Sequence, residues 1–187
     1  MKMFHFTLFV FVLLICQSFE QQPLPYTFGY RSSYKVHQQG NINLIISAPH
    51  GGNTIPSSQV PDRTIGGCNR TNGSNPNVCT WFFNDTCTDG VRCESTTVKD
   101  TQSDEFAENV ANHLNKTWNY KPFVVIAQWH RRTVDYNREI EEATFNHPES
   151  ILAYQGYHNA IEQAINQINQ TAGRALLIDI HGHAQGK

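Results

Sequence analysis

Two histidines stand where apolar runs of the chain end, each beside a glycine. His50 lies within Ser47-Ala-Pro-His-Gly-Gly52, and His181 lies within Asp179-Ile-His-Gly182. Uninterrupted apolar runs predict strands buried on both faces, and open α/β sheets carry functional groups just beyond the carboxyl ends of such strands. Catalytic zinc takes three protein ligands, often histidines, and keeps one position open. We therefore predict that His50 and His181 share one zinc ion.

Two further polar side chains flank the second histidine. Asp179 comes two residues before His181, so on a strand both side chains point to the same face. This spacing predicts that Asp179 orients a zinc ligand by hydrogen bonding to it without binding the metal itself. His183 follows directly, either as a further ligand or as a rim residue that contacts the substrate. Asp179 and His183 are therefore the predicted catalytic partners of the zinc site.

A second polar set surrounds Arg138. A guanidinium group presents a fork of donors that matches a carboxylate, so Arg138 beside Asn137 predicts a clamp for a small carboxylate-bearing substrate. The alternative is a surface ion pair between Arg138 and one of three acidic neighbours: Asp135, Glu139 or Glu141.

Two more arginines precede this set in the chain. Arg131 and Arg132 add positive potential near the predicted clamp, and Arg132 is included among the predicted substrate-binding residues. We expect one of the two to pair with Asp135.

The elements that must position these residues alternate along the chain. The spacing of apolar residues predicts amphipathic helices over 104–118 and 149–170, with Thr171-Ala-Gly173 ending the second. The apolar run 122–127 predicts another buried strand. The order of the expected elements is strand, long loop, helix, strand, loop, helix and strand. This alternation predicts an α/β fold with a largely parallel or mixed sheet flanked by helices. Capping candidates for the first helix are Asp100, Thr101 and Ser103.

The amino terminus predicts secretion. Residues 1–18 carry one lysine and then an uncharged apolar core, which is typical of a signal peptide and too short to span a membrane. Residues 19–40 are predicted to form an extended lead-in, and 41–187 one domain. We therefore expect a secreted, extracellular protein that has no membrane partner after signal cleavage.

The long loop 63–97 agrees with an oxidising compartment, because an even set of cysteines favours disulfides there. Structural zinc is the alternative, although no Cys-x-x-Cys spacing occurs, and the three possible pairings remain open. The cysteines are Cys68, Cys79, Cys87 and Cys93. The acceptor sequons for glycosylation are at Asn69, Asn72, Asn84, Asn115 and Asn169.

Composition narrows the class of partner. The chain has 187 residues, is 39% hydrophobic and 16% charged, and has a formal net charge of −2. These values fit one globular core, and the absence of a basic stripe argues against nucleic acid as partner.

Four motifs together resemble the N-formylglutamate amidohydrolase family. They are Ser47-Ala-Pro-His-Gly-Gly52, Asp100-x-x-Ser-x-Glu-Phe-Ala107, His130-Arg-Arg-Thr-Val-Asp-Tyr-Asn-Arg138 and Ile178-Asp-Ile-His-Gly182. The resemblance covers about residues 41–186. It implies a zinc carboxypeptidase-like (phosphorylase/hydrolase-like) fold and water activated by zinc for attack on an amide carbonyl. It also implies an asparagine-arginine pair that holds the substrate carboxylate.

The resemblance also bears on the third zinc ligand and on the general base. Zinc carboxypeptidases place a glutamate three residues after the first histidine, where this chain has Asn53. In the amidohydrolase pattern the matching acid is Asp100, with helix capping as the alternative role. The family's candidate bases lie beyond Asp-x-His-Gly, and the sequence ends at Lys187 soon after it. We therefore expect a chain that is incomplete at its carboxyl terminus.

These observations support three hypotheses. The first is a secreted zinc-dependent amidohydrolase that acts on a small acyl-amino acid or peptide with a free carboxylate. The second is an inactive secreted protein that binds carboxylates on the same scaffold. The third is a disulfide-bonded interaction module in which the histidines are structural.

Overall fold

A mixed five-stranded sheet organises the protein, and its strand order is β1-β2-β6-β3-β7. The computed structural model describes residues 22–57, 59–63, 66–69, 80–83 and 95–182. β3 (Leu44–Ala48) lies between β6 (Phe123–Ala127) and β7 (Leu176–Asp179), parallel to both. Because parallel strands end at the same edge, the segments after these three strands lie close together. The predicted α/β class is confirmed.

The antiparallel part of the sheet comes from the segment predicted to be an extended lead-in. β1 (Thr27–Phe28) and β2 (Tyr34–His37) are joined by the 3-10 turn η1 (Tyr30–Ser32), and β2 pairs antiparallel with β6. The residues before β3 therefore complete the sheet on its β6 side.

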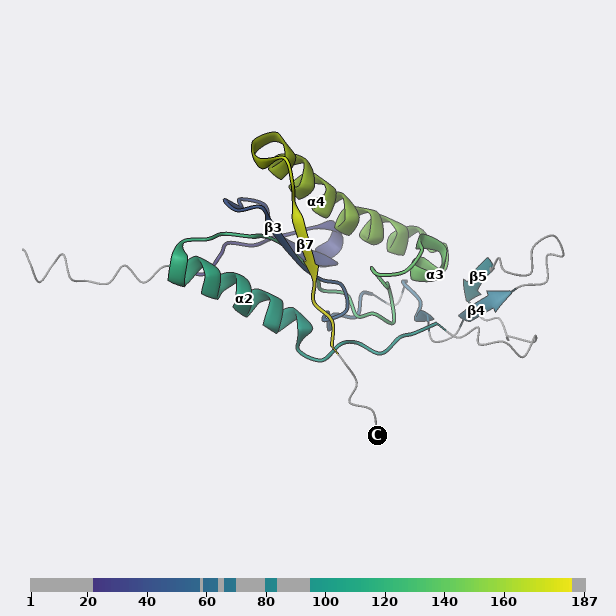
Figure 1. Ribbon diagram of the computed structural model, residues 1–187. Coiled ribbons are helices and arrows are strands. Elements are labelled where there is room, and N and C mark those ends of the chain that lie inside the picture. The colour runs from purple at the N-terminus through teal and green to yellow at the C-terminus, as the bar shows by residue number, and fades with distance from the viewer. Residues whose placement is uncertain (1–21, 58, 64–65, 70–79, 84–94, 183–187) are drawn as a thin grey trace, which may run out of the picture.

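Two long helices cover opposite faces of the sheet (Figure 1). α2 (Ser103–Trp118) and α4 (Pro148–Ala172) lie close to the predicted ranges, and a short helix that was not predicted, α3 (Ile140–Thr144), precedes α4. Along β6, Val124 and Ile126 pack in the cluster with α2, whereas Val125 packs in a cluster with α4. Successive strand side chains point to opposite faces, so one apolar run supplies both layers of the core.

The start of α2 differs from its predicted cap. The residue before the helix is Gln102, in the left-handed conformation, and no side chain caps the first turn. Ser103 lies inside the helix and its hydroxyl donates to the carbonyl oxygen of Asp100 at 3.3 Å. The Asp100 carboxylate points elsewhere, so the helix-capping alternative for Asp100 is wrong.

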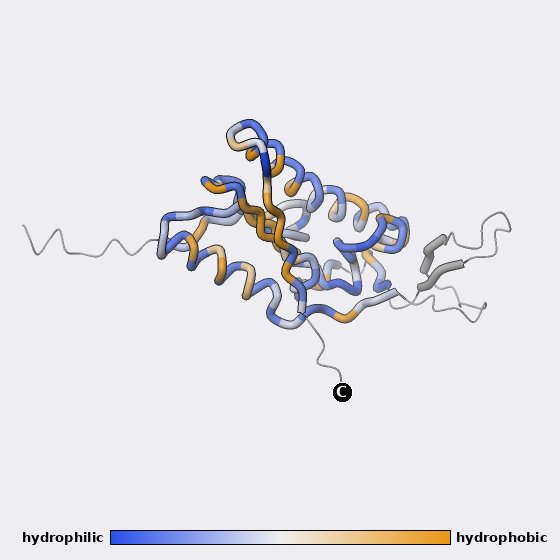
Figure 2. Tube along the Cα trace, viewed as in Figure 1, coloured by the Kyte–Doolittle hydropathy of each residue, from blue (hydrophilic) through white to orange (hydrophobic). Residues whose placement is uncertain are grey.

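β7 is apolar but exposed. The predicted strand is confirmed, but all four of its residues are exposed, including Leu176 at 60%. In the part of the chain that the structure describes, β3 is its one hydrogen-bonded neighbour. The prediction that β7 is buried on both faces is therefore wrong for these residues, and Figure 2 shows the apolar strand at the edge of the sheet.

The loop between β3 and α2 contains a separate two-stranded sheet of β4 (Gly66–Asn69) and β5 (Thr80–Phe83). Only the backbone of Cys68 and Asn69 is described. The other predicted disulfide and glycosylation positions in this loop lie outside the described residues: Cys79, Cys87, Cys93, Asn72 and Asn84. None of the described helices has the length and apolar character needed to cross a membrane.

Candidate metal centre

The two predicted histidines meet at the carboxyl ends of β3 and β7. The parallel register places Ser47 opposite Asp179, and the backbone N–H of Ile180 donates to the carbonyl oxygen of Ser47 at 2.8 Å. Each histidine comes two residues after its strand, and the ring centroids of His50 and His181 are 4.9 Å apart. The sheet therefore brings together residues that are 131 positions apart in the sequence.

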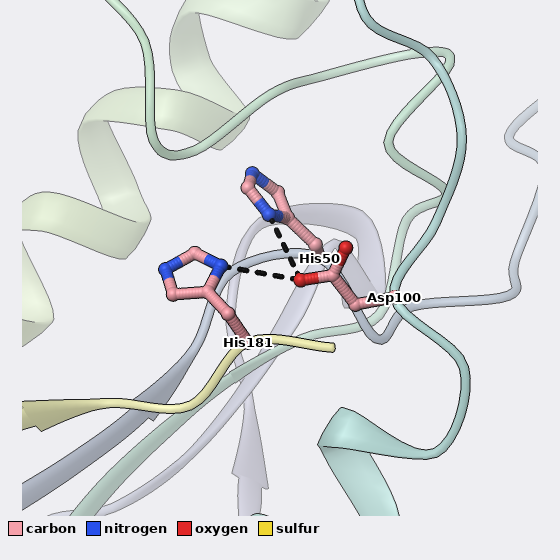
Figure 3. Close-up of side chains that lie close together, drawn as sticks. All are labelled: His50, Asp100 and His181. Atoms are coloured by element: carbon pink, nitrogen blue, oxygen red, sulfur yellow. Dashed lines mark hydrogen bonds and ion pairs between the residues drawn. The ribbon is translucent and has the colours of Figure 1, made fainter. Parts of the chain in front are cut away.

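Asp100 joins the two histidines from the segment that precedes α2 (Figure 3). Its Oδ2 lies 3.3 Å from Nδ1 of His50 and 3.1 Å from Nδ1 of His181. The backbone N–H of Gly182 donates to the same oxygen at 2.9 Å. Burial acts to raise the pKa of Asp100, but the Gly182 hydrogen bond and the two histidines hold it below its ordinary value. A charged carboxylate thus faces both imidazoles.

This donor set fits a metal ion. One ligand atom from each of His50, Asp100 and His181 lies within 4.8 Å of the others. With zinc ligands at about 2.0–2.1 Å, the edge of a coordination tetrahedron is about 3.3 Å. The two distances from Asp100 to the histidines match that edge. Nitrogen and carboxylate ligands are those that zinc accepts at catalytic sites, so the group can hold a metal ion.

A buried carboxylate orients His50 from the other side. Oδ1 of Asp135 lies 2.6 Å from Nε2 of His50, and Asp135 is completely buried. Burial alone would raise the pKa of Asp135, but the His50 hydrogen bond and the nearby charges of His50 and Arg131 hold it well below its ordinary value. A carboxylate at Nε2 keeps the imidazole proton there and leaves the Nδ1 lone pair for the metal.

Arg131 connects the two carboxylates of the site. Its Nε donates to Oδ2 of Asp135 at 2.8 Å, and one terminal nitrogen lies 3.7 Å from Oδ1 of Asp100. The expectation that Arg131 or Arg132 pairs with Asp135 is confirmed for Arg131. Sequence reasoning gave Asp135 no role at the histidines, although its place in the Asp-x-Asn-Arg motif was a usable signal.

Glycines let the site segments approach one another. A side chain on Gly52 would place its Cβ 2.4 Å from the backbone oxygen of Trp129, at the end of β6. A Cβ on Gly182 would lie 3.0 Å from that of Asp100. The close packing of the loops after β3, β6 and β7 therefore requires the small residues that accompany the two histidines.

A polar recess adjoins the metal centre. Its volume is about 390 Å³, and its lining includes Asn137 and Arg138. The amide nitrogen of Asn137 lies 3.3 Å from Nε2 of His181, which links the recess to the histidines. Nε of Arg138 lies 3.4 Å from Glu142, and one terminal nitrogen donates to the carbonyl oxygen of Asn137 at 2.8 Å. Arg138 thus has an ion pair, but its partner is Glu142, which is not one of the three acidic neighbours expected in the alternative.

Two predicted site residues have no hydrogen bond to the two histidines of the metal centre among the described residues, and a third lies outside the described part of the chain. Arg132 is exposed and faces Asp62 at 3.4 Å, so the arginine beside the metal ligands is Arg131 instead. Within the described part of the chain, the carboxylates that contact the two histidines are those of Asp100 and Asp135, and the one behind His50 is Asp135. No hydrogen bond there supports the prediction that Asp179 orients a zinc ligand. Burial raises the pKa of Asp179. His183 lies outside the described residues.

Two glycosylation sequons lie on described helices. Asn169 on α4 is exposed. Asn115 on α2 is only 3% exposed, and its amide donates to the carbonyl oxygen of Gln22 at 3.2 Å. A glycan has no room there, so the structure corrects the prediction for Asn115.

Comparison of the chain with protein-family models, with curated proteins and with solved structures finds no match.

Proposed function

We propose that the protein is a secreted zinc-dependent amide hydrolase with a zinc carboxypeptidase-like fold. One observation carries the proposal: two histidines and an aspartate converge at the carboxyl edge of the parallel strands, next to a recess that contains an arginine. The resemblance of the ordered motifs to N-formylglutamate amidohydrolases supports the same assignment. The substrate is a small acyl-amino acid or peptide with a free carboxylate.

His50, Asp100 and His181 would hold the ion in this proposal. Zinc bound there would polarise the amide carbonyl and lower the pKa of a bound water to about 7. Asp135 fixes the ring and the tautomer of His50, since it accepts at Nε2 from a completely buried position. Arg131 neutralises Asp135 and holds it in place.

Arg138 and Asn137 serve to bind the substrate. Both line the recess, and the Asn137 amide also contacts His181, so a carboxylate held there keeps the rest of the substrate close to the histidines. Binding of the carboxylate at this position would also hold the reacting amide in a fixed orientation near the histidines. Asp179, two residues before His181, is the candidate proton-transfer group.

A second candidate function is a binding protein without turnover on the same scaffold. One observation favours it. In the described part of the chain, the carboxylates in contact with the histidines are Asp100 and Asp135, and both are engaged in holding them. This second function predicts ligand binding with no hydrolysis.

Turnover separates the two functions. Purified protein loaded with zinc should hydrolyse Nα-acetyl-amino acids, lose this activity with a chelator, and regain it when zinc is restored. Binding of the same compounds without hydrolysis would support the second function. Hydrolysis that is unaffected by complete removal of metal would contradict the zinc mechanism.

Secretion has its own test. Protein recovered from the medium of expressing cells should lack residues 1–18 and contain no free thiol among its four predicted disulfide cysteines. A secreted form that begins at Met1, or one with alkylatable thiols at these positions, would contradict this part of the proposal.

A further inference from the structure

The recess beside the metal centre carries more negative than positive charge. Its lining has one guanidinium, on Arg138, and two carboxylates, on Glu139 and Glu142. Burial lowers the pKa of His158, which also lines the recess, so its imidazole is neutral near pH 7. A substrate that brings only negative charge therefore enters a site that already has an excess of it.

Arg138 is already partly engaged. Glu142 lies 3.4 Å from its Nε, and the carbonyl oxygen of Asn137 accepts from one of its terminal nitrogens. A substrate carboxylate that binds Arg138 competes with Glu142 for the guanidinium. Glu142 then loses part of its ion pair, unless the substrate brings a positive charge that takes over the role of Arg138.

Aromatic side chains complete the lining. Tyr136 is buried, and the hydroxyl of Tyr154 donates to the carbonyl oxygen of Arg138 at 2.8 Å. The rings of Tyr154 and His158 are tilted by 47° to each other, with centroids 4.3 Å apart. Carboxylates next to aromatic rings favour a bound cation, because the ring faces carry negative potential.

We propose that the recess selects an acyl-amino acid with a cationic side chain, whose carboxylate binds Arg138 and whose cation binds Glu142 and Glu139. The inference rests on the proposed function, since it uses the same carboxylate clamp. It differs in substrate class from the acyl-glutamate that the family resemblance suggests. With a lysine-like or arginine-like substrate, the Arg138–Glu142 pair is replaced by two pairs, one between Arg138 and the substrate carboxylate and one between Glu142 and the substrate cation. A substrate with a second carboxylate would instead be repelled by Glu142 and Glu139.

Non-hydrolysable ligands measure this selection without turnover. In Nα-methanesulfonyl-lysine, -norleucine and -glutamate, a sulfonamide replaces the scissile amide, and the side chain is cationic, neutral or anionic. Calorimetric titration of the zinc-loaded protein should rank lysine tightest and glutamate weakest, with about a tenfold or greater difference between them. Glutamate binding as tight as lysine, or tighter, would overturn the inference.

Two glutamine variants test the residue that makes the selection. Glu142→Gln should bring the affinities for the lysine and norleucine ligands close together and tighten binding of the glutamate ligand. Glu141→Gln is the matched control, because Glu141 is exposed on the same helix, α3, and does not line the recess. Equal effects of the two substitutions, with unchanged melting temperatures, would also overturn the inference.

One more ligand separates this inference from the proposed function. Nα-methanesulfonyl-lysinamide lacks the carboxylate and should bind at least tenfold more weakly than the acid, because it cannot form the charge-assisted hydrogen bonds with Arg138. Equal binding of amide and acid would contradict the carboxylate clamp of the proposed function. If the acid binds more tightly than the amide but the lysine ligand does not bind more tightly than the glutamate ligand, only this inference is contradicted.

Discussion

Asp135 decides which nitrogen of His50 faces the metal centre. An imidazole has two chemically distinct nitrogens, and the one with the shorter contact to a carboxylate keeps the proton. Asp135 lies 2.6 Å from Nε2, so Nδ1 is left with its lone pair toward Asp100 and His181. The orientation of His50 as a candidate metal ligand therefore depends on a residue from the loop after β6, 85 positions away in the sequence.

Replacing Asp135 with asparagine should weaken zinc binding by about 10–100-fold, because the amide no longer fixes the tautomer of His50. The substitution also removes the nearer carboxylate partner of the buried Arg131 and leaves it only the more distant Asp100, which should cost up to about 3–5 kcal/mol of stability. Zinc affinity measured by competition with a chelating dye checks the first effect, and chemical denaturation checks the second. Asp62→Asn is the control, and the same zinc affinity in Asp135→Asn as in this control would contradict the orienting role.

Asp179 belongs to the reaction rather than to the zinc ligands in the proposed mechanism. Asp179→Asn should lower kcat by about 10²–10⁴-fold, the usual contribution of a positioned acid or base. The variant should keep its zinc, since the donor set of His50, Asp100 and His181 does not include Asp179. Full kcat in Asp179→Asn would remove this residue from the chemistry.

The sequence predicted the three side chains of the candidate metal centre better than the residues around them. His50 and His181 were recognisable because each follows an apolar run beside a glycine. Asp100 needed the family motif, since its distance from both histidines depends on the path of a long loop. The contact between Asp135 and His50 was not predicted: the motif marked Asp135, but its partner depends on the packing of the loops after β3 and β6 against each other.

At the scale of the elements, one glutamate ties α4 to the turn between the first two strands. Glu149, in the first turn of α4, accepts a hydrogen bond from the hydroxyl of Tyr30 at 2.8 Å and pairs with Arg31. Both contacts join α4 to the η1 turn between β1 and β2. The β1–β2 segment therefore depends on α4 as well as on its pairing with β6.

This contact predicts a pH dependence of stability. The hydrogen bonds from Tyr30 and Arg31 lower the pKa of Glu149 in the folded state. A lowered folded pKa means that the stabilisation is present above the unfolded value of about 4.3 and is lost as pH falls through the folded value.

Glu149→Gln should therefore lower the free energy of unfolding at pH 7 and flatten its fall on acidification below about pH 5. Urea denaturation of both proteins from pH 7 to pH 3 measures the difference. Because Glu149 is on the surface, the expected effect is small. A constant difference between the two proteins across this range would contradict the ion-pair account, and Glu162→Gln, on the exposed face of α4, serves as the control.

For the whole molecule, the elements with strong periodicity were predictable from the sequence. The strands β3, β6 and β7 and the helices α2 and α4 each have a clear apolar run or helical spacing, and all five were found. β1, β2 and α3 were missed because none of these short segments has an uninterrupted apolar run or a repeated helical spacing of apolar residues. Their structure depends on contacts with β6 and α4 rather than on local sequence.

The exposure of β7 shows that apolar composition alone does not predict whether a strand is buried. Its residues are as apolar as those of β3 and β6, yet Leu177 and Ile178 are exposed by 43% and 44%. An apolar run predicts that a segment can be buried in a sheet, and the position of the strand in the sheet decides whether it is. Among the described residues that position is the edge, next to β3.

The central claim is that His50 and His181 hold one zinc ion. Elemental analysis of the purified full chain should find about one equivalent of zinc, and His50→Ala/His181→Ala should lose it. His113→Ala, which removes an exposed histidine on α2, should keep the full equivalent. Full retention of zinc by the double variant, in protein that remains folded by circular dichroism, would contradict the account.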